Sequence, residues 1–189
     1  MRKRYTLLVM AMLCLVSAPF AQIPNRIAVG DQLPSNFWNT EYSVYQKGKL
    51  TKQNLKDFEG QPFILDFWAT WCSTCLKNFK VLDSASRSLK LAVLLVNSQN
   101  SGDNFDKVDK CLSTLNDGKL GLPSILNDTL LQHYFPSHTL PHYVWINGSG
   151  RVQAITGTVP LNWESLKMMA SEENRSRKIT KQTNNSPKK

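Results

Sequence analysis

Two apolar runs of strand length enclose one amphipathic segment in the middle of the chain. The runs Pro62–Trp68 and Leu91–Val96 are nearly continuous in apolar residues, which is typical of strands buried on both faces of a sheet. Between them, Ser73–Leu89 carries apolar residues at spacings of three and four, which predicts a helix with one buried face. The order strand, helix, strand predicts a right-handed crossover and parallel pairing of the two strands.

The rest of the chain adds helices and an antiparallel strand pair. A β-like stretch at Ser43–Tyr45 precedes a turn at Lys47–Lys49, and Thr51–Phe58 is predicted to be a short helix with Thr51 as its N-cap. Helices are predicted at Phe105–Leu115, at Thr129–Tyr134 and at residues 161–169. Between the last two, the strand His142–Ile146 is predicted to pair antiparallel with Arg151–Thr156. The pattern indicates an α/β protein with a central mixed sheet flanked by helices, an N-terminal β extension and a helical insertion.

The two ends of the chain differ from its body. Residues 1–21 begin with three basic residues, continue through the apolar stretch Leu7–Val16 and close on small residues, which predicts a cleaved secretory signal. Residues 172–189 are basic and polar and are predicted to be a disordered tail. The domain between them, residues 22–171, carries 14 basic and 12 acidic residues. Since most of the net charge of +9 lies at the ends, nucleic-acid binding is not expected. The signal predicts export to the periplasm or cell envelope, with an uncleaved N-terminal anchor as the alternative.

Cleavage of the signal removes Cys14 and leaves three cysteines. Cys72 and Cys75 form a close pair. Cys111 stands alone and is predicted to be a buried free thiol, with intermolecular pairing as the alternative. In an exported protein, one close pair plus a single thiol predicts a reactive dithiol rather than structural disulfides. The pair falls at the start of the predicted helix Ser73–Leu89, where unpaired backbone N–H groups and the helix dipole stabilise a thiolate. Cys72 is therefore the predicted nucleophile, and Cys75 the thiol that resolves a mixed disulfide.

A Cys-x-x-Cys pair also occurs in metal sites. Tetrahedral zinc needs four ligands, and the sequence offers neither a second such pair nor a paired histidine motif. The histidines His133, His138 and His142 are separated by Pro136 and Pro141, so they do not share one helix. No cofactor is predicted, and copper delivery through the dithiol and His142 stays open as an alternative.

The segment Asp66–Cys75 resembles the active-site block of thioredoxins. Upstream, Val29–Pro34 resembles the opening of the exported TlpA/ResA-like disulfide reductases, and the step Leu140–Pro141 is similar to the cis-proline segment of that family. The resemblance spans residues 29–169 and implies a thioredoxin fold. The chain departs from the family pattern between the cysteines and on the following helix, at Ser73, Thr74, Asn78 and Lys80.

The resemblance implies a role for each site residue. Cys72 would attack the substrate disulfide, and Cys75 would release it. Asp66, on a buried strand, would move the proton of the second cysteine, because desolvation raises the pKa of a carboxyl. Pro141, if cis, would face the dithiol and present backbone to the substrate. His142 is either a modulator of the dithiol or an edge histidine without a role.

The predicted function is extracytoplasmic thiol:disulfide oxidoreduction, with reduction of protein disulfides favoured by the resemblance. The expected partners are protein or small-molecule disulfides and dithiols and a membrane thiol-electron donor, and the expected state is a monomer. Besides copper delivery, two alternatives stay open. A peroxiredoxin-like peroxidase needs a threonine three residues before its reactive cysteine, where this chain has Ala69, with Thr70 one position off. A redox-inert binding module on the same fold would keep its function without Cys72.

Overall fold

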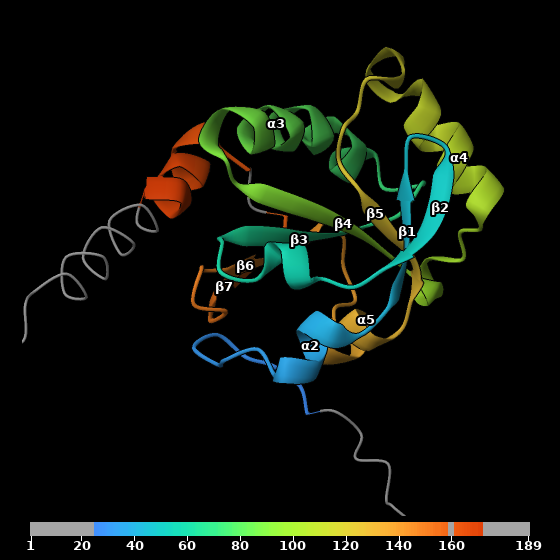
Figure 1. Cartoon of the computed structure of the whole chain (residues 1–189). Coiled ribbons are helices and arrows are strands. Elements are labelled where there is room, and N and C mark those ends of the chain that lie inside the picture. The colour runs from blue at the N-terminus through green and yellow to red at the C-terminus, as the bar shows by residue number, and fades with distance from the viewer. Residues whose placement is uncertain (1–24, 159–160, 172–189) are drawn as a thin grey trace, which may run out of the picture.

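A computed structural model describes residues 25–158 and 161–171 of the chain (Figure 1). The predicted signal, residues 1–21, and the predicted tail, residues 172–189, lie outside the described residues. Within the described part, no helix is both long enough and apolar enough to cross a membrane.

Seven strands of the described residues form one mixed sheet in the order β2-β1-β5-β4-β3-β6-β7. Strands β3, β4 and β5 run parallel, β6 and β7 extend the sheet antiparallel on one side, and the β1–β2 hairpin extends it antiparallel on the other. The predicted parallel pair and the predicted antiparallel pair are therefore both confirmed. The strand bounds are β1 Tyr42–Gln46, β2 Lys49–Gln53, β3 Phe63–Trp68, β4 Ala92–Ser98, β5 Ser124–Asp128, β6 His142–Ile146 and β7 Val152–Thr156.

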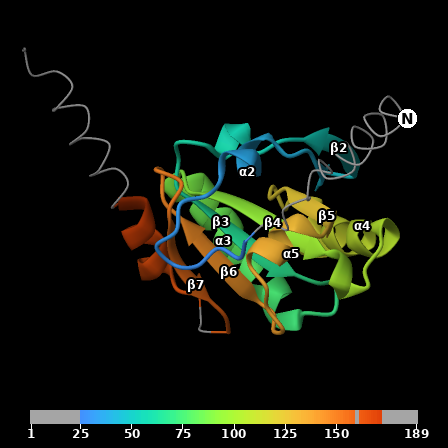
Figure 2. The ribbon, with the colours of Figure 1, turned by 90° about the horizontal axis from the view of Figure 1, so that it is seen from below.

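Helices cover both faces of the sheet. Figure 1 shows α3 and α4 above the sheet and α2 and α5 below it, and Figure 2 views the molecule from the α2 and α5 side. Each face has its own apolar core, one shared with α3, α4 and residues 163–171, and the other shared with α2 and α5. The helix bounds are α2 Ser35–Asn39, α3 Ser73–Leu89, α4 Phe105–Thr114 and α5 Leu130–Tyr134, with 3-10 turns at Lys56–Phe58, Gln99–Ser101 and Leu115–Gly118.

The junction between β3 and α3 fixes where the cysteine pair lies. Every residue of β3 is buried, as expected of a central strand. The helix α3 has the predicted bounds, buries the apolar face that includes Phe79 and Leu82, and ends where Lys90 takes a left-handed conformation with φ of 55°. The Cys72 side chain caps the first turn of this helix. The strand-to-helix turn therefore holds the pair at the carboxyl edge of the parallel strands.

Three parts of the fold differ from the prediction. Residues Thr51–Phe58 do not form a helix that Thr51 caps: Thr51 lies in β2, and only a 3-10 turn follows at Lys56–Phe58. The predicted insertion contributes a strand as well as a helix, because β5 follows α4 and pairs parallel with β4. The short helix α2 was not predicted; it packs Phe37 and Trp38 into the lower core. The other predicted helices and strands are confirmed to within a few residues at their ends, and the last helix covers residues 163–171.

Candidate active site

The cysteine pair forms a disulfide at the amino end of α3. The Cys72 and Cys75 sulfurs lie 2.03 Å apart, and their Cα atoms lie 5.3 Å apart. Cys72 is the N-cap of α3, and its Sγ accepts a hydrogen bond from the backbone N–H of Cys75 at 3.2 Å. Cys72 keeps 6% of its surface exposed, whereas Cys75 keeps none. An external thiol or disulfide therefore meets the Cys72 sulfur first.

A carboxyl group lies in the sheet on the same side as the dithiol. Ile64 and Trp68 of β3 belong to the core beneath α3, together with both cysteines. Because side chains alternate along a strand, Asp66 faces the same side. Asp66 is fully buried, and within the described residues neither of its carboxyl oxygens has a hydrogen-bond partner. Burial raises the pKa of this carboxyl well above its usual range. The site thus contains an acid able to hold a proton at a pH where most carboxyls are ionised.

A loop acid that the sequence did not single out holds the segment before Cys72. The Asp103 carboxylate accepts hydrogen bonds from the Thr70 backbone N–H at 2.8 Å and from the Thr70 hydroxyl at 2.5 Å. The Asp103 carboxylate also accepts a hydrogen bond from the Asn97 side-chain amide at 2.8 Å. The same amide donates to the Trp68 carbonyl at 3.3 Å. No pattern in the sequence joins Asp103 to Thr70, because 33 residues separate them. The contact follows only from the crossover that brings the end of β4 beside the end of β3.

The two tryptophans of the block have different environments. Trp68 is 1% exposed, packs edge-on against Phe79 with ring centroids 5.2 Å apart, and donates from its indole nitrogen to the Ser124 hydroxyl at 3.0 Å. Trp71 is 65% exposed, and its indole donates to the Ser101 carbonyl at 2.9 Å. Trp68 is a core residue, whereas Trp71 presents its ring at the surface beside Cys72.

The Leu140–Pro141 peptide bond is cis, as the resemblance implied. The next residue, His142, is not at an edge of the sheet, because β6 lies between β3 and β7. His142 is buried and its ring lies 5.2 Å from the Phe67 ring, on the side opposite Asp66. Burial lowers the pKa of this imidazole. The strand alternation therefore turns His142 away from the dithiol face, which rules out both predicted placements.

The third cysteine is a free thiol on α4. Cys111 is half-buried rather than fully buried, at the margin of the core beneath α3. Burial, and to a lesser degree the charge of Asp103, raises the pKa of its thiol. A protonated thiol is a poor nucleophile, so Cys111 is chemically distinct from a cysteine at the start of a helix.

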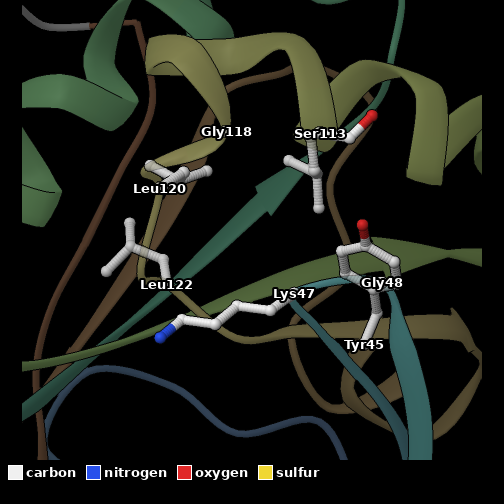
Figure 3. Close-up of a pocket in the computed structure, with 8 residues that line it drawn as sticks. Tyr45, Lys47, Gly48, Ser113, Gly118, Leu120 and Leu122 are labelled. Atoms are coloured by element: carbon white, nitrogen blue, oxygen red, sulfur yellow. The ribbon is translucent and has the colours of Figure 1, made fainter.

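The structure has cavities away from this dithiol. One of about 310 Å³ opens between the β1–β2 turn and the end of α4, and Figure 3 shows it in close-up. Its lining residues are Tyr45, Lys47, Gly48, Leu112, Ser113, Gly118, Leu120 and Leu122. A second, of about 270 Å³, lies near Tyr42 and Asp128. Neither is lined by a predicted site residue. Among residues 25–158 and 161–171, no group of three or more His, Cys, Asp or Glu side chains is arranged to hold a metal ion.

Comparison with known proteins agrees with this chemistry. No protein-family model matches the chain. ResA of Bacillus subtilis, a thiol-disulfide oxidoreductase, is 24% identical over 150 residues, which cover 78% of this chain and 82% of ResA. DsbE of Vibrio cholerae, a thiol:disulfide interchange protein, is 35% identical over 83 residues, which cover 43% of this chain and 39% of DsbE.

Solved structures show the same fold at low identity. The MTB dsbF structure has a TM-score of 0.60 at 15% identity and covers 75% of this chain and 98% of its own. The Enterococcus faecalis AhpC structure has a TM-score of 0.60 at 15% identity and covers 86% of this chain and 99% of its own. At these identities the likeness shows the fold alone.

The fold, the dithiol at the start of α3 and these relatives define the chain as a thiol-disulfide oxidoreductase with a thioredoxin fold. The chain is similar to the TlpA/ResA-like members of the thioredoxin superfamily.

Proposed function

We propose that this oxidoreductase works outside the cytoplasm and reduces protein disulfides, with Cys72 as the nucleophile and Cys75 as the resolving thiol. The observation that carries the proposal is the Cys72–Cys75 disulfide at the amino end of α3, with 6% of the Cys72 surface exposed and none of the Cys75 surface. In the reduced protein, a thiolate at Cys72 would lie beside unpaired N–H groups of the first turn, which lower a thiol pKa.

In the first step, the Cys72 thiolate attacks one sulfur of the substrate disulfide. A bond forms between Cys72 and that sulfur, and the other substrate sulfur leaves as a thiolate that takes a proton from solvent. In the second step, Cys75 gives its proton to Asp66 and attacks the Cys72 sulfur, which releases the second substrate sulfur as a thiolate. The substrate gains two electrons and, with solvent, two protons, while the dithiol becomes a disulfide.

Asp66 is proposed as the proton acceptor of the second step because it lies on the dithiol side of β3 and carries no competing hydrogen bond within the described residues. Pro141 is proposed to present backbone to an extended substrate segment, since it precedes β6 and its family counterparts face the dithiol. No bound cofactor takes part in either step.

Continued turnover requires a donor of two electrons. We propose that a membrane thiol protein supplies them to an exported, monomeric enzyme, in keeping with the predicted signal at residues 1–21. The substrates are disulfides of proteins or of small molecules, and the direction toward reduction rests on the TlpA/ResA-like resemblance.

A disulfide-reduction assay tests the proposal. The full chain without its signal is mixed with insulin and a dithiol donor, beside Cys72→Ser and, as a matched control, Cys111→Ser. We expect turnover by the wild type and by Cys111→Ser, and none above background by Cys72→Ser. Absence of turnover in the wild type with any of several donors contradicts the proposal.

The same proteins separate the alternatives. A peroxidase would consume hydrogen peroxide faster than it reduces insulin, but the Thr70 hydroxyl is engaged by Asp103 and Ala69 has no hydroxyl. A redox-inert binding module would give no turnover in either assay.

A further inference from the structure

A buried tyrosine hydroxyl lies on the same side of the sheet as Asp66. Tyr143 of β6 is the register partner of Asp66 in the antiparallel β3–β6 pair. Partners in such a pair place their side chains on one face, with Cβ atoms about 4.5–5.5 Å apart. Tyr143 is 1% exposed and belongs to the core that contains Cys72 and Cys75. It is thus a polar side chain within the protein interior next to the proposed proton acceptor.

The helix that carries the dithiol holds this hydroxyl in place. The side-chain amide of Asn78, three residues after Cys75 on α3, donates a hydrogen bond to the Tyr143 hydroxyl oxygen at 2.8 Å. Asn78 is half-buried. Because the phenol oxygen accepts from Asn78, its own hydrogen stays available for an acceptor. The two Asp66 oxygens, which have no partner among the described residues, are acceptors on that face.

The electrostatics agree with this proximity. Burial, followed by the charge of Asp66, raises the pKa of the Tyr143 hydroxyl above its usual value, so the phenol keeps its proton throughout the physiological range. The titratable groups that face Asp66 are Tyr143 from β6 and the dithiol from α3, while β4 places Leu95 opposite it in register. Burial raises the pKa of Asp66, and no cation among residues 25–158 and 161–171 contributes to the shift.

Resting on the proposed function, we infer that Tyr143, held by Asn78, is a positioning residue that donates a hydrogen bond to the ionised Asp66 and keeps that carboxylate able to accept the Cys75 proton. Since neither Asp66 oxygen has a direct hydrogen-bond partner within the described residues, the bond passes through one water molecule. The proton moves from the Cys75 sulfur to an Asp66 oxygen, and the Tyr143 proton is not transferred. Without the hydroxyl, the carboxylate loses its donor, and a higher pH is needed to ionise it.

The test follows the two steps separately. The reduced Cys111→Ser protein, used as the background to leave only two thiols, is mixed with 5,5′-dithiobis(2-nitrobenzoate) in a stopped-flow instrument between about pH 5 and pH 9. The first release of thionitrobenzoate reports attack by Cys72, and the second reports resolution by Cys75. In this background we compare Tyr143→Phe, Asn78→Ala and the control Tyr45→Phe, which removes a tyrosine hydroxyl bonded instead to Asp109 at 2.7 Å.

We expect Tyr143→Phe to shift the acid limb of the second phase upward by about one pH unit, which slows resolution about tenfold below that limb, and to leave the first phase unchanged. Asn78→Ala is expected to shift the limb in the same direction while keeping the tyrosine, so the test stands even if Tyr143→Phe folds poorly. Tyr45→Phe should match the background.

Three outcomes overturn the inference: second-phase profiles that superpose for Tyr143→Phe and the background, an equal shift with Tyr45→Phe, or equal slowing of both phases. Failure of the proposed function is distinct from these. It appears as a background protein that does not release two equivalents of thionitrobenzoate and does not form its internal disulfide.

Discussion

The Asp103 carboxylate accepts two hydrogen bonds from Thr70, one from the backbone N–H at 2.8 Å and one from the hydroxyl at 2.5 Å. Thr70 lies two residues before Cys72. In the same loop as Asp103, the Ser101 carbonyl accepts a hydrogen bond from the Trp71 indole N–H. The loop after β4 therefore fixes the segment that presents the nucleophile.

Replacement of Asp103 is expected to loosen this segment. Asp103→Ala should lower the free energy of unfolding by about 1–3 kcal/mol, because hydrogen bonds to a charged group are lost. It should also slow the first phase of thionitrobenzoate release. Urea unfolding and stopped-flow kinetics measure the two effects. Asp106→Ala, which removes an exposed acid nearby on α4, is the control, and equal behaviour of the two variants would show that Asp103 has no special role.

The two tryptophans should respond differently to truncation. Trp68→Ala removes a buried indole and is expected to cost about 3–5 kcal/mol of stability. Trp71→Ala removes an exposed ring beside Cys72 and should change stability by less than about 1 kcal/mol while lowering kcat/KM for insulin. Thermal unfolding together with insulin reduction separates these effects. A large loss of stability in Trp71→Ala would show that its ring is structural.

The pH dependence of stability should report Asp66. Its carboxyl keeps a proton to higher pH in the folded protein than in the unfolded chain, since burial raises its folded pKa. Between those two pKa values the folded state binds more protons, so the free energy of unfolding falls as pH rises. Asp66→Asn should flatten this fall, so the variant should gain stability relative to the wild type as the pH rises from 4 to 8.

Urea unfolding of the oxidised proteins across that pH range gives the comparison. Asp128, whose pKa burial also raises, contributes a slope of the same sign in both proteins and cancels in the difference. Parallel curves for wild type and Asp66→Asn would show that Asp66 is not the acid described here.

Removal of the resolving thiol should trap the intermediate. Cys75→Ser keeps the nucleophile but lacks the group that releases substrate, so a mixed disulfide between Cys72 and substrate should accumulate. Intact-mass spectrometry after mixing with a peptide disulfide measures it, with Cys72→Ser as the control that should form none. If Cys72→Ser instead forms a mixed disulfide through Cys111, then Cys111 and not Cys72 is the nucleophile.

Local patterns were sufficient to predict the centre of the fold. The apolar periodicity of α3 and the continuous apolar strand β3 are strong signals, so the cysteine pair could be placed at their junction. The strand β5 was missed because its five residues, Ser124–Asp128, include Asn127 at a positive φ of 53° and lack a clear alternation. The Thr51–Phe58 prediction was wrong because hairpin pairing with β1 overrode a weak helical pattern.

Of the site, the sequence predicted only the residues that belong to the motifs of the family resemblance. Asp66 and the cis bond before Pro141 could be placed from the resemblance, but the partners of the site depend on register and crossover. Tyr143 shares a face with Asp66 only because β3 and β6 pair as they do, and a shift of one residue would have brought His142 to that face instead.

The reduction potential of the Cys72–Cys75 pair tests the central claim most directly. The protein is equilibrated with glutathione buffers of defined ratio, its thiols are trapped by alkylation, and the oxidised fraction is read by mass. A reductase requires a potential well below about −200 mV, and that is the result we expect. A potential near the −120 mV of a strong disulfide oxidant would contradict the assignment.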